Sequence, residues 1–451
     1  MFRFFLNNMN IGLIAWLLLG VVHAQAKTLP MVGFFTPGGV PHELIHKMPV
    51  GMMNVTDISR VRQVFKQAEG SAFRISIDFG PALTPARSVS ELSMQYQDGN
   101  GKTRVKLFEP PVENKLRTIP SDGKIRAILA PYLDVLALYP SNVGTVFLAD
   151  EPYLNGISKM EMERLARIVR QELDKRKLTR IELGVVFAAG MFNKDFAALI
   201  SRQAGVYVAG IDDYFLRYRQ QAGNSQDFKQ WVKNIKENRL VTYDRAGNMY
   251  TGGGLPKGFD VVGFDFYLST LLLDNLHENT LAWLAVRYPQ HGCGQFANQT
   301  MSRIRSNLSF FQDGIVKQGH DVYQKDKLLL DAIFDCRMGA ITDMLVQASG
   351  KKPIKFLMYS ESSNNGVLEF DSKGVPEQGQ PEKLVEARAL DEAIRAQRFY
   401  LRNASKFSAG LMYFTYQNEY DYSIKLNIGG ASAMPTVLKN ILDFAKTPMQ
   451  P

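Results

Sequence analysis

The sequence predicts an α/β protein and, within that class, a (β/α)8 TIM barrel. Eight short runs rich in β-branched and aromatic residues recur along the chain, and amphipathic stretches of helical length separate them. Several runs are apolar throughout, which is typical of strands buried on both faces of a parallel sheet. Acidic residues directly follow several runs, where barrels carry their functional groups. An open, doubly wound sheet is the alternative, and the eight repeats with acidic strand ends favour a closed barrel.

The predicted strands are short. In chain order they are Met31 to Phe35, Phe73 to Phe79, Val143 to Leu148, Arg180 to Phe187, Val206 to Ile211, Phe259 to Phe266, Pro353 to Tyr359 and Gly410 to Tyr416. The clearest amphipathic stretches are Ser158 to Lys177, Phe192 to Ala204, Asp227 to Asn238 and Glu382 to Ser405. We expect these stretches to be helices that cover the barrel.

Two segments do not fit the strand and helix alternation. Met94 to Phe108 predicts a β-hairpin around Asp98-Gly99-Asn100-Gly101, a strong turn signal, and we expect it in the second βα loop. Residues 268–350 are mostly helical in pattern, follow the sixth predicted strand and contain both cysteines. We therefore expect one barrel domain over residues 27–451, with insertions at about 90–110 and 268–350.

The N-terminus has the pattern of a secretory signal peptide. Arg3 precedes an apolar run from Ile11 to Val22, and Ala24-Gln25-Ala26 is a small-x-small cleavage pattern. A transmembrane anchor needs about 20 apolar residues, and this run is about 12 long. We therefore expect residues 1–26 to be removed, no integral membrane segment afterwards, and a secreted or periplasmic protein.

Composition narrows the function classes. With 45% hydrophobic and 22% charged residues, the chain is an ordinary globular protein. The net charge of +9 is scattered rather than clustered, which argues against a nucleic-acid site. Only Cys293 and Cys336 are present, so we expect a disulfide in an oxidising compartment and no cysteine-rich metal site. No cofactor or metal is expected.

Carboxylates and aromatic residues dominate the predicted strand ends. Carboxylates accept hydrogen bonds from sugar hydroxyls, and flat aromatic rings stack on the apolar faces of sugar rings. The pattern therefore predicts a carbohydrate substrate. The residues expected to bind it are Asp78, Asp150, Tyr153, Asp212, Asp213, Asp265, Tyr267, Phe35, Tyr416 and Gln417.

Glu151 and Glu361 are the best catalytic pair. Glycosidic cleavage needs one carboxyl group held protonated as a general acid and a second as nucleophile or base. Each of these glutamates directly follows an apolar run, so a rigid strand presents it. The neighbouring Asp150 is expected to raise the pKa of Glu151 by like-charge repulsion. The structural alternative is that Asp150 caps a helix or pairs with a buried arginine such as Arg74.

Three of the predicted strand ends resemble those of the retaining barrel glycosidases. Residues 145–153, Thr-Val-Phe-Leu-Ala-Asp-Glu-Pro-Tyr, are similar to the strand that presents the acid/base glutamate of that superfamily. Residues 259–267 are similar to its sixth strand and residues 356–362 to its seventh. The resemblance implies that Glu151 is the acid/base, Glu361 the nucleophile and Tyr267 the residue that orients it.

The sequence departs from that pattern in one respect. The acid/base glutamate of that superfamily ends the fourth strand, whereas Glu151 follows the third predicted strand here. Either one strand is missing from the count, or this barrel is a more distant one. In the second case a wider separation of Glu151 and Glu361 favours inversion over retention, or Asp212 or Asp213 replaces one of them.

Parts of the sequence are compatible with two other functions. His42-Glu43-Leu44-Ile45-His46 matches the H-E-x-x-H pattern of zinc proteases, but prolines bracket it and no strong third ligand follows. We expect this segment to lie in the first βα loop. The stronger rival is a barrel that binds polysaccharide without cleaving it, assisting envelope or exopolysaccharide assembly.

Overall fold

The computed structural model describes residues 29–85, 93–97, 100, 102–107, 117–153, 157–193, 195–196, 254–266, 280–300, 303–304, 306, 323–364, 367, 382–421 and 426–449. The predicted signal peptide, the strand Val206 to Ile211, the helix Asp227 to Asn238, and Asp212, Asp213 and Tyr267 lie outside these residues, as does most of Phe192 to Ala204.

Eight parallel strands form one sheet, which confirms the predicted fold class. The sheet order is β1 (Val32–Phe34), β10 (Gly410–Phe414), β9 (Lys355–Glu361), β8 (Val261–Asp265), β7 (Glu182–Ala188), β6 (Val143–Asp150), β3 (Arg74–Asp78) and β2 (Val50–Asn54). A further bridge joins Phe35 after β1 to Met52 of β2. The sheet therefore curls round into a (β/α)8 barrel.

The contact between β1 and β2 depends on a glycine. A Cβ atom at Gly33 would lie 2.4 Å from the Val50 carbonyl oxygen, so a larger residue would push the two strands apart. Thr36 follows β1, and both its backbone N–H and its hydroxyl donate to the Met52 carbonyl, at 2.8 and 3.0 Å. These bonds hold the two edge strands of the sheet together.

The second strand of the barrel is Val50–Asn54, which the sequence analysis did not predict. The segment Phe73 to Phe79 therefore supplies the third strand, and Val143 to Asp150 supplies the fourth. Glu151 thus follows the fourth strand, and Glu361 ends the seventh. This count corrects the placement of Glu151 after a third strand, and it removes the departure from the glycosidase pattern.

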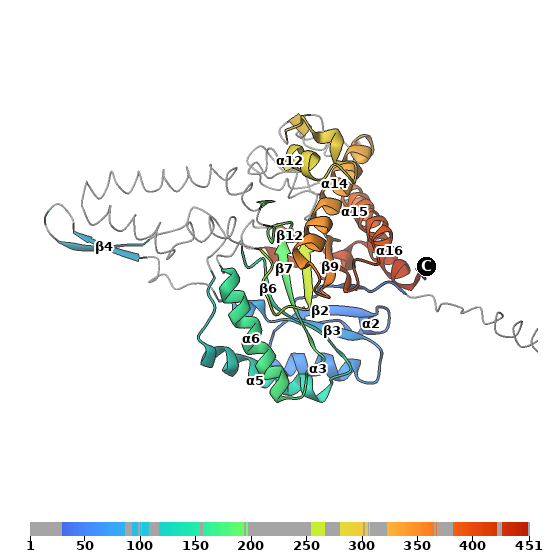
Figure 1. Cartoon of the computed structure of the whole chain (residues 1–451). Coiled ribbons are helices and arrows are strands. Elements are labelled where there is room, and N and C mark those ends of the chain that lie inside the picture. Colours follow the sequence, from blue (N-terminus) through green and yellow to red (C-terminus); the bar gives the residue numbers. More distant parts are fainter. Residues whose placement is uncertain are drawn as a thin grey trace, which may run out of the picture.

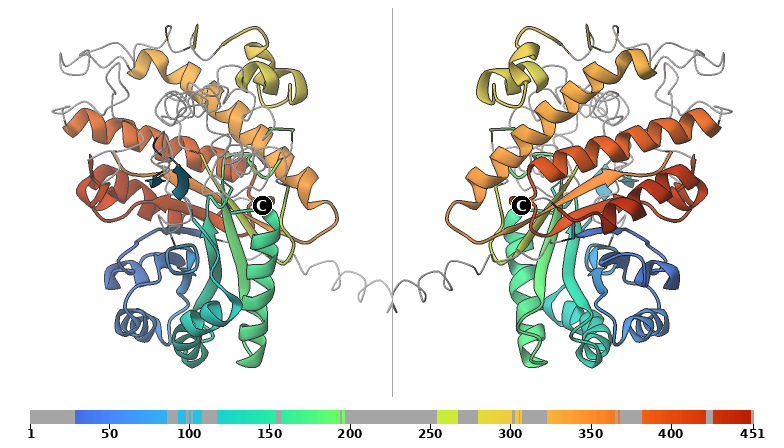
Figure 2. Two further views of the ribbon diagram at one scale, coloured as in Figure 1. Left: turned by 90° about the vertical axis from the view of Figure 1, so that its left-hand side faces the viewer. Right: turned by 90° about the vertical axis from the view of Figure 1, so that its right-hand side faces the viewer.

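Helices pack along the outside of the barrel. The helices α3 (Ile58–Ala68), α5 (Asp122–Leu138) and α6 (Lys159–Lys175) lie along one side, and α14 (Tyr323–Ser349), α15 (Glu382–Arg402) and α16 (Pro435–Lys446) lie along another (Figures 1 and 2). The short helices are α2 (His42–Ile45), α4 (Gly80–Leu83), α12 (Thr280–Arg287), η3 (Cys293–Phe296) and η6 (Ala431–Ala433). None of the described helices is both long and apolar enough to span a bilayer.

The α6 helix shows how local sequence sets these boundaries. Ser158 caps its N-terminus and exchanges hydrogen bonds with Glu161 in a capping box. Apolar residues then recur at helical spacing, and Met162, Leu165 and Val169 are buried against the sheet. The predicted helix Ser158 to Lys177 therefore forms with nearly the expected bounds.

Two apolar clusters occupy the two faces of the sheet. The smaller one fills the barrel interior and consists of Val50, Met52, Phe147, Val186, Val261, Leu357, Tyr359 and Met412. The larger one lies between the strands and the outer helices. Because successive side chains of a strand point to opposite faces, alternate residues of each strand enter the two clusters.

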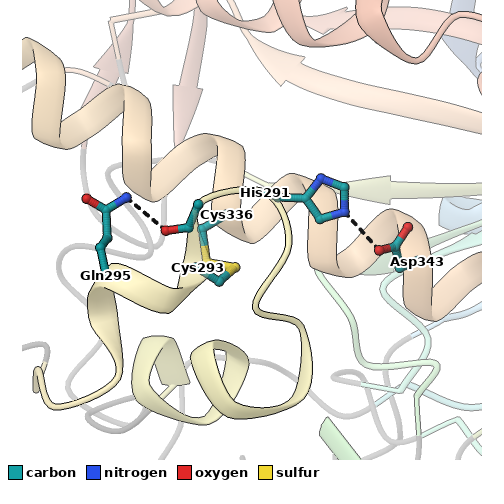
Figure 3. Close-up of a disulfide and its surroundings, with 6 residues drawn as sticks. His291, Cys293, Gln295, Cys336 and Asp343 are labelled. Carbon is teal, nitrogen blue, oxygen red and sulfur yellow. Dashed lines mark hydrogen bonds and ion pairs between the residues drawn. A yellow bond between two sulfur atoms is a disulfide. The ribbon is translucent and has the colours of Figure 1, made fainter.

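Two additions extend the barrel. The strands β4 (Ser93–Gln97) and β5 (Thr103–Leu107) pair antiparallel as a hairpin after β3, in the third βα loop rather than the second. Between β8 and β9, Cys293 of η3 and Cys336 of α14 form a disulfide with their Cα atoms 4.7 Å apart (Figure 3). Beside it, His291 contacts Asp343 at 2.8 Å (Figure 3).

A small two-stranded sheet follows the last barrel strand. It consists of β11 (Glu419–Asp421) and β12 (Leu426–Ile428), which pair antiparallel. Ile428 at the end of β12 lines the cavity described below. The segment after β10 therefore contributes to the wall of the functional face.

Candidate active site

A cavity of about 350 Å³ opens at the carboxyl ends of the barrel strands. Four carboxyl groups and several apolar and aromatic side chains line it. The lining residues are Phe35, Met52, Asp78, Phe147, Ala149, Asp150, Glu151, Val186, Asp265, Tyr359, Phe414 and Ile428. Small-molecule sites of barrel enzymes lie at this end of the fold.

The strands themselves position the four carboxyl groups. Asp78, Asp150 and Asp265 are the last residues of β3, β6 and β8, and Glu151 follows Asp150 directly. In a parallel barrel these ends share one face, so residues far apart in sequence meet there. The structure thus brings together Asp78, Asp150, Glu151 and Asp265, four of the residues singled out from the sequence.

Glu151 adopts a backbone conformation that L-residues with side chains rarely take. Its φ is +45°, in the left-handed region, while its N–H still donates to the Val186 carbonyl of β7 at 2.9 Å. Such conformations are unfavourable for a residue other than glycine and cluster at functional sites, where the surrounding structure enforces them. The backbone here turns Glu151 out of the strand and into the cavity.

Burial and neighbouring charges raise the pKa of Glu151 well above its ordinary value. Desolvation is the largest cause, and the charges of Asp265 and Asp150 add to it. The protonated carboxyl of Glu151 donates a hydrogen bond to Asp265, which stabilises the proton on Glu151. Burial, the two neighbouring charges and this hydrogen bond therefore all favour the protonated form of Glu151.

The other three cavity carboxyls also have raised pKa values. Desolvation raises the pKa of Asp78 to about 7 and that of Asp265 to about 7, and repulsion from Asp150 contributes to both. Asp150 is accessible from the cavity. Desolvation by the surrounding protein nevertheless raises its pKa to about 6, and the positive charge of Arg117 opposes this rise. Asp150 is thus the most readily ionised of the four.

Arg74 does not supply a partner for Asp150. Its guanidinium donates to the Val143 carbonyl at 3.0 and 3.2 Å, at the start of β6 and so at the opposite end of the strand from Asp150. The nearby cation is Arg117, whose charge lowers the pKa values of Asp78, Asp150 and Glu151. Sequence reasoning missed Arg117, because it lies in no strand and next to no motif.

The second predicted catalytic residue, Glu361, lies at the end of β9. It is 1% exposed and is not among the residues that line the cavity. Its Oε1 atom accepts hydrogen bonds from the backbone of Ser362 and Ser363 and from the Ser363 hydroxyl, at 3.2, 3.0 and 2.6 Å. Desolvation outweighs these bonds and raises the pKa of Glu361 to about 8.

The strand register nevertheless places Glu361 beside the cavity. Its partner across the sheet is Phe414, and Tyr359 lies two residues earlier on the same strand. Both of these residues line the cavity. The Oε2 atom of Glu361 is buried and has no hydrogen-bond partner within the described part of the chain.

The predicted binding residues divide into two groups. Phe35 lines the cavity with Asp78, Asp150 and Asp265. Tyr153 is buried and its hydroxyl donates to the Gly254 carbonyl at 2.5 Å, while the Tyr416 hydroxyl donates to Glu43 at 2.5 Å. Gln417 is partly exposed near Gly38. Tyr153, Tyr416 and Gln417 are not part of the cavity lining.

Sequence reasoning missed the apolar part of the cavity. Met52, Phe147, Val186 and Tyr359 lie inside strands, two or three positions before the last residue of each strand. Phe414 is the last residue of β10. Met52, Val186 and Tyr359 each lie two positions before the last residue of their strand, so the alternation of side chains, counted back from the strand ends, is the signal that would have found them.

The raised pKa values predict that stability depends on pH. Between about pH 4 and pH 7 the folded protein keeps protons that the unfolded chain has lost, so the free energy of unfolding falls as pH rises. Asp78→Asn keeps the side-chain oxygen that accepts a hydrogen bond from the Gly80 N–H. In this variant the free energy of unfolding is expected to decrease less between pH 5 and pH 8. Urea unfolding at pH 5 and pH 8 measures the effect. Asp134→Asn, at a side chain 67% exposed, is the control and should leave the fall unchanged.

The overall fold is similar to those of solved glycoside hydrolases. An endo-beta-mannanase/endo-beta-glucanase from Prevotella bryantii is 9% identical with a TM-score of 0.37, covering 92% of this chain and 48% of that one. The GH53 catalytic domain of Ignisphaera aggregans is 12% identical with a TM-score of 0.37, covering 92% and 96%. A beta-glucosidase from Exiguobacterium marinum is 9% identical with a TM-score of 0.41, covering 93% and 99%.

The chain thus spans about half the length of the Prevotella protein. No protein-family model matches the sequence, and a comparison with curated proteins gives no match. The residues of the cavity are therefore the feature of this chain that indicates a function.

Proposed function

We propose that this protein is an exported glycoside hydrolase that cleaves a polysaccharide or oligosaccharide, with Glu151 as its general acid. The observation that carries the proposal is the Glu151 carboxyl itself. It follows the fourth strand of the barrel and lines the cavity, and its pKa is raised well above the ordinary value for glutamate. A carboxylic acid with a raised pKa in a cavity is what protonation of a glycosidic oxygen requires.

In this mechanism Glu151 donates its proton to the bridging oxygen as the bond from that oxygen to the anomeric carbon breaks. A second carboxylate either attacks the anomeric carbon or takes a proton from the attacking water. The rings of Phe35, Phe147, Tyr359 and Phe414 offer apolar surfaces for the sugar. Asp150, the most readily ionised carboxyl of the cavity, suits hydrogen bonding to sugar hydroxyls.

We assign the second role to Glu361. Asp265 is not suited to it, because its hydrogen bond to Glu151 brings the two carboxyls closer than the roughly 5 Å that a sugar between them needs. Glu361 ends the seventh strand and lies in register with Phe414 of the cavity. To act, its side chain must turn away from Ser362 and Ser363, lose its proton and enter the cavity.

One observation favours a second function, a barrel that binds polysaccharide without cleaving it. The Glu361 carboxyl is buried, protonated at neutral pH and bonded to the following turn rather than facing the cavity. A cavity from which the second glutamate stays turned away would bind a sugar and leave its linkage intact. Such a protein would serve envelope or exopolysaccharide assembly.

A panel of bacterial and plant polysaccharides tests both functions. Reducing ends are counted after incubation with the wild type, with Glu361→Gln, and with Glu382→Gln at an exposed position of α15 as the matched control. Hydrolysis follows from release of reducing ends, and binding from retarded migration in gels that contain the polymer. We expect cleavage by the wild type and the control and loss of cleavage with retained binding in Glu361→Gln.

Two other results of this experiment would change the assignment. Cleavage that survives Glu361→Gln would remove Glu361 from the mechanism and leave the hydrolase. Retarded migration without cleavage in every sample would establish the binding barrel instead.

A further inference from the structure

The short helix α2 carries two histidines whose rings converge. His42 begins the helix and His46 lies one turn later at its C-cap, and both side chains are exposed. Their Nε2 atoms are 3.3 Å apart, and the rings meet edge to face with centroids 4.8 Å apart. Leu44 and Ile45 are buried and fix the helix to the barrel, so the two rings are presented on a stable support.

This separation suits two ligands of one metal ion. Zinc binds imidazole nitrogen at about 2.0–2.1 Å with tetrahedral angles, which places two ligand nitrogens about 3.3 Å apart. The two Nε2 atoms already have this spacing. The two nitrogens are in hydrogen-bond contact, so an ion that replaces the shared proton requires no change in their separation.

Glu43 does not complete a protease site. Its Oε1 atom accepts a hydrogen bond from the Tyr416 hydroxyl at 2.5 Å, so the carboxyl is engaged with the end of the eighth strand rather than with a water on the metal. Among the described residues, no group of three or more histidine, cysteine or acidic side chains could hold a metal ion. A metal held by His42 and His46 would take its remaining ligands from water.

We propose that His42 and His46 form a two-histidine site for a divalent transition-metal ion, with Zn²⁺ as the representative ligand. Imidazole ligands suit Zn²⁺, Cu²⁺ and Ni²⁺, whereas Mg²⁺ and Ca²⁺ select oxygen ligands. The site is separate from the acidic cavity, because neither histidine lines it. It does not depend on the hydrolase assignment.

Isothermal titration of the full-length chain, prepared without a polyhistidine tag, tests the site. ZnCl₂ titrated into the wild type is expected to show a site that His42→Ala and His46→Ala each weaken by at least about tenfold, or 1.4 kcal/mol. Glu43→Gln keeps both imidazoles and should bind as the wild type does. MgCl₂ should give no binding heat.

Thermal unfolding provides a second readout. A ligand that binds only the folded state raises the melting temperature, so Zn²⁺ should raise it for the wild type and Glu43→Gln but not for His42→Ala/His46→Ala. Absence of Zn²⁺ binding to the wild type would overturn the proposal, and so would equal binding to the double variant. Zinc binding lost in Glu43→Gln would overturn the two-histidine site in favour of one that includes the carboxylate.

Discussion

Replacing Glu151 with glutamine is expected to lower kcat by about two to four orders of magnitude on a natural glycoside, the usual contribution of general acid catalysis. Glutamine has nearly the same shape and its amide can still donate to Asp265, so the fold and the cavity should persist. It cannot release a proton to the glycosidic oxygen. The loss therefore isolates the chemical role of the acid from its role in packing.

The leaving group makes this prediction specific to acid catalysis. A sugar alcohol leaves poorly without protonation, whereas a dinitrophenolate leaves well as an anion. Kinetics of Glu151→Gln on a natural oligosaccharide and on the corresponding dinitrophenyl glycoside should therefore show a large loss of kcat on the first and a much smaller one on the second. Equal losses on both substrates would contradict the role of Glu151 as the acid.

Replacing Arg395 with leucine is expected to lower the free energy of unfolding by about 3–5 kcal/mol, the range for breaking a buried ion pair. Arg395 lies on α15 and its side chain is 1% exposed, as is that of its partner Glu392. It also donates to Asp391 and Asp331, each at 2.6 Å. Without the guanidinium, Glu392 keeps its burial and loses the charge that opposes the rise in its pKa.

Arg398→Leu is the matched control for this substitution. Arg398 lies on the same helix and contacts the same Asp331 at 3.0 Å, but its side chain is 48% exposed. Exposed ion pairs contribute about 0–1 kcal/mol, so this variant should unfold close to the wild type in urea. Equal effects of the two substitutions would contradict the view that burial sets the importance of Arg395.

The barrel was predictable from the sequence because several of its strands are apolar almost throughout and alternate with amphipathic helices. Val143 to Asp150 and Val261 to Asp265 are buried on both faces, and their pattern needs no tertiary information to be recognised. Val50–Asn54 was missed because it has one β-branched residue, carries two methionines and begins directly after Pro49. Its strand conformation comes from pairing with β3, which local sequence does not encode.

The candidate site was predictable only in part, for a related reason. Asp78, Asp150, Glu151 and Asp265 follow strands, so a search of strand ends finds them. Such a search cannot tell which way a side chain turns after the strand. Glu151 turns into the cavity, whereas Glu361 bonds to the backbone of the next two residues. Tyr153 was expected to contact substrate, but its hydroxyl donates a hydrogen bond to the Gly254 carbonyl.

The left-handed backbone at Glu151 has a consequence for how such a barrel changes over evolutionary time. Glycine or asparagine would adopt the conformation at φ +45° with less strain than glutamate does. Descendants of this chain that no longer need the acid should drift toward those residues at this position before the surrounding strands change. The residue at position 151 would then distinguish homologues that keep the catalytic acid from homologues that have lost it.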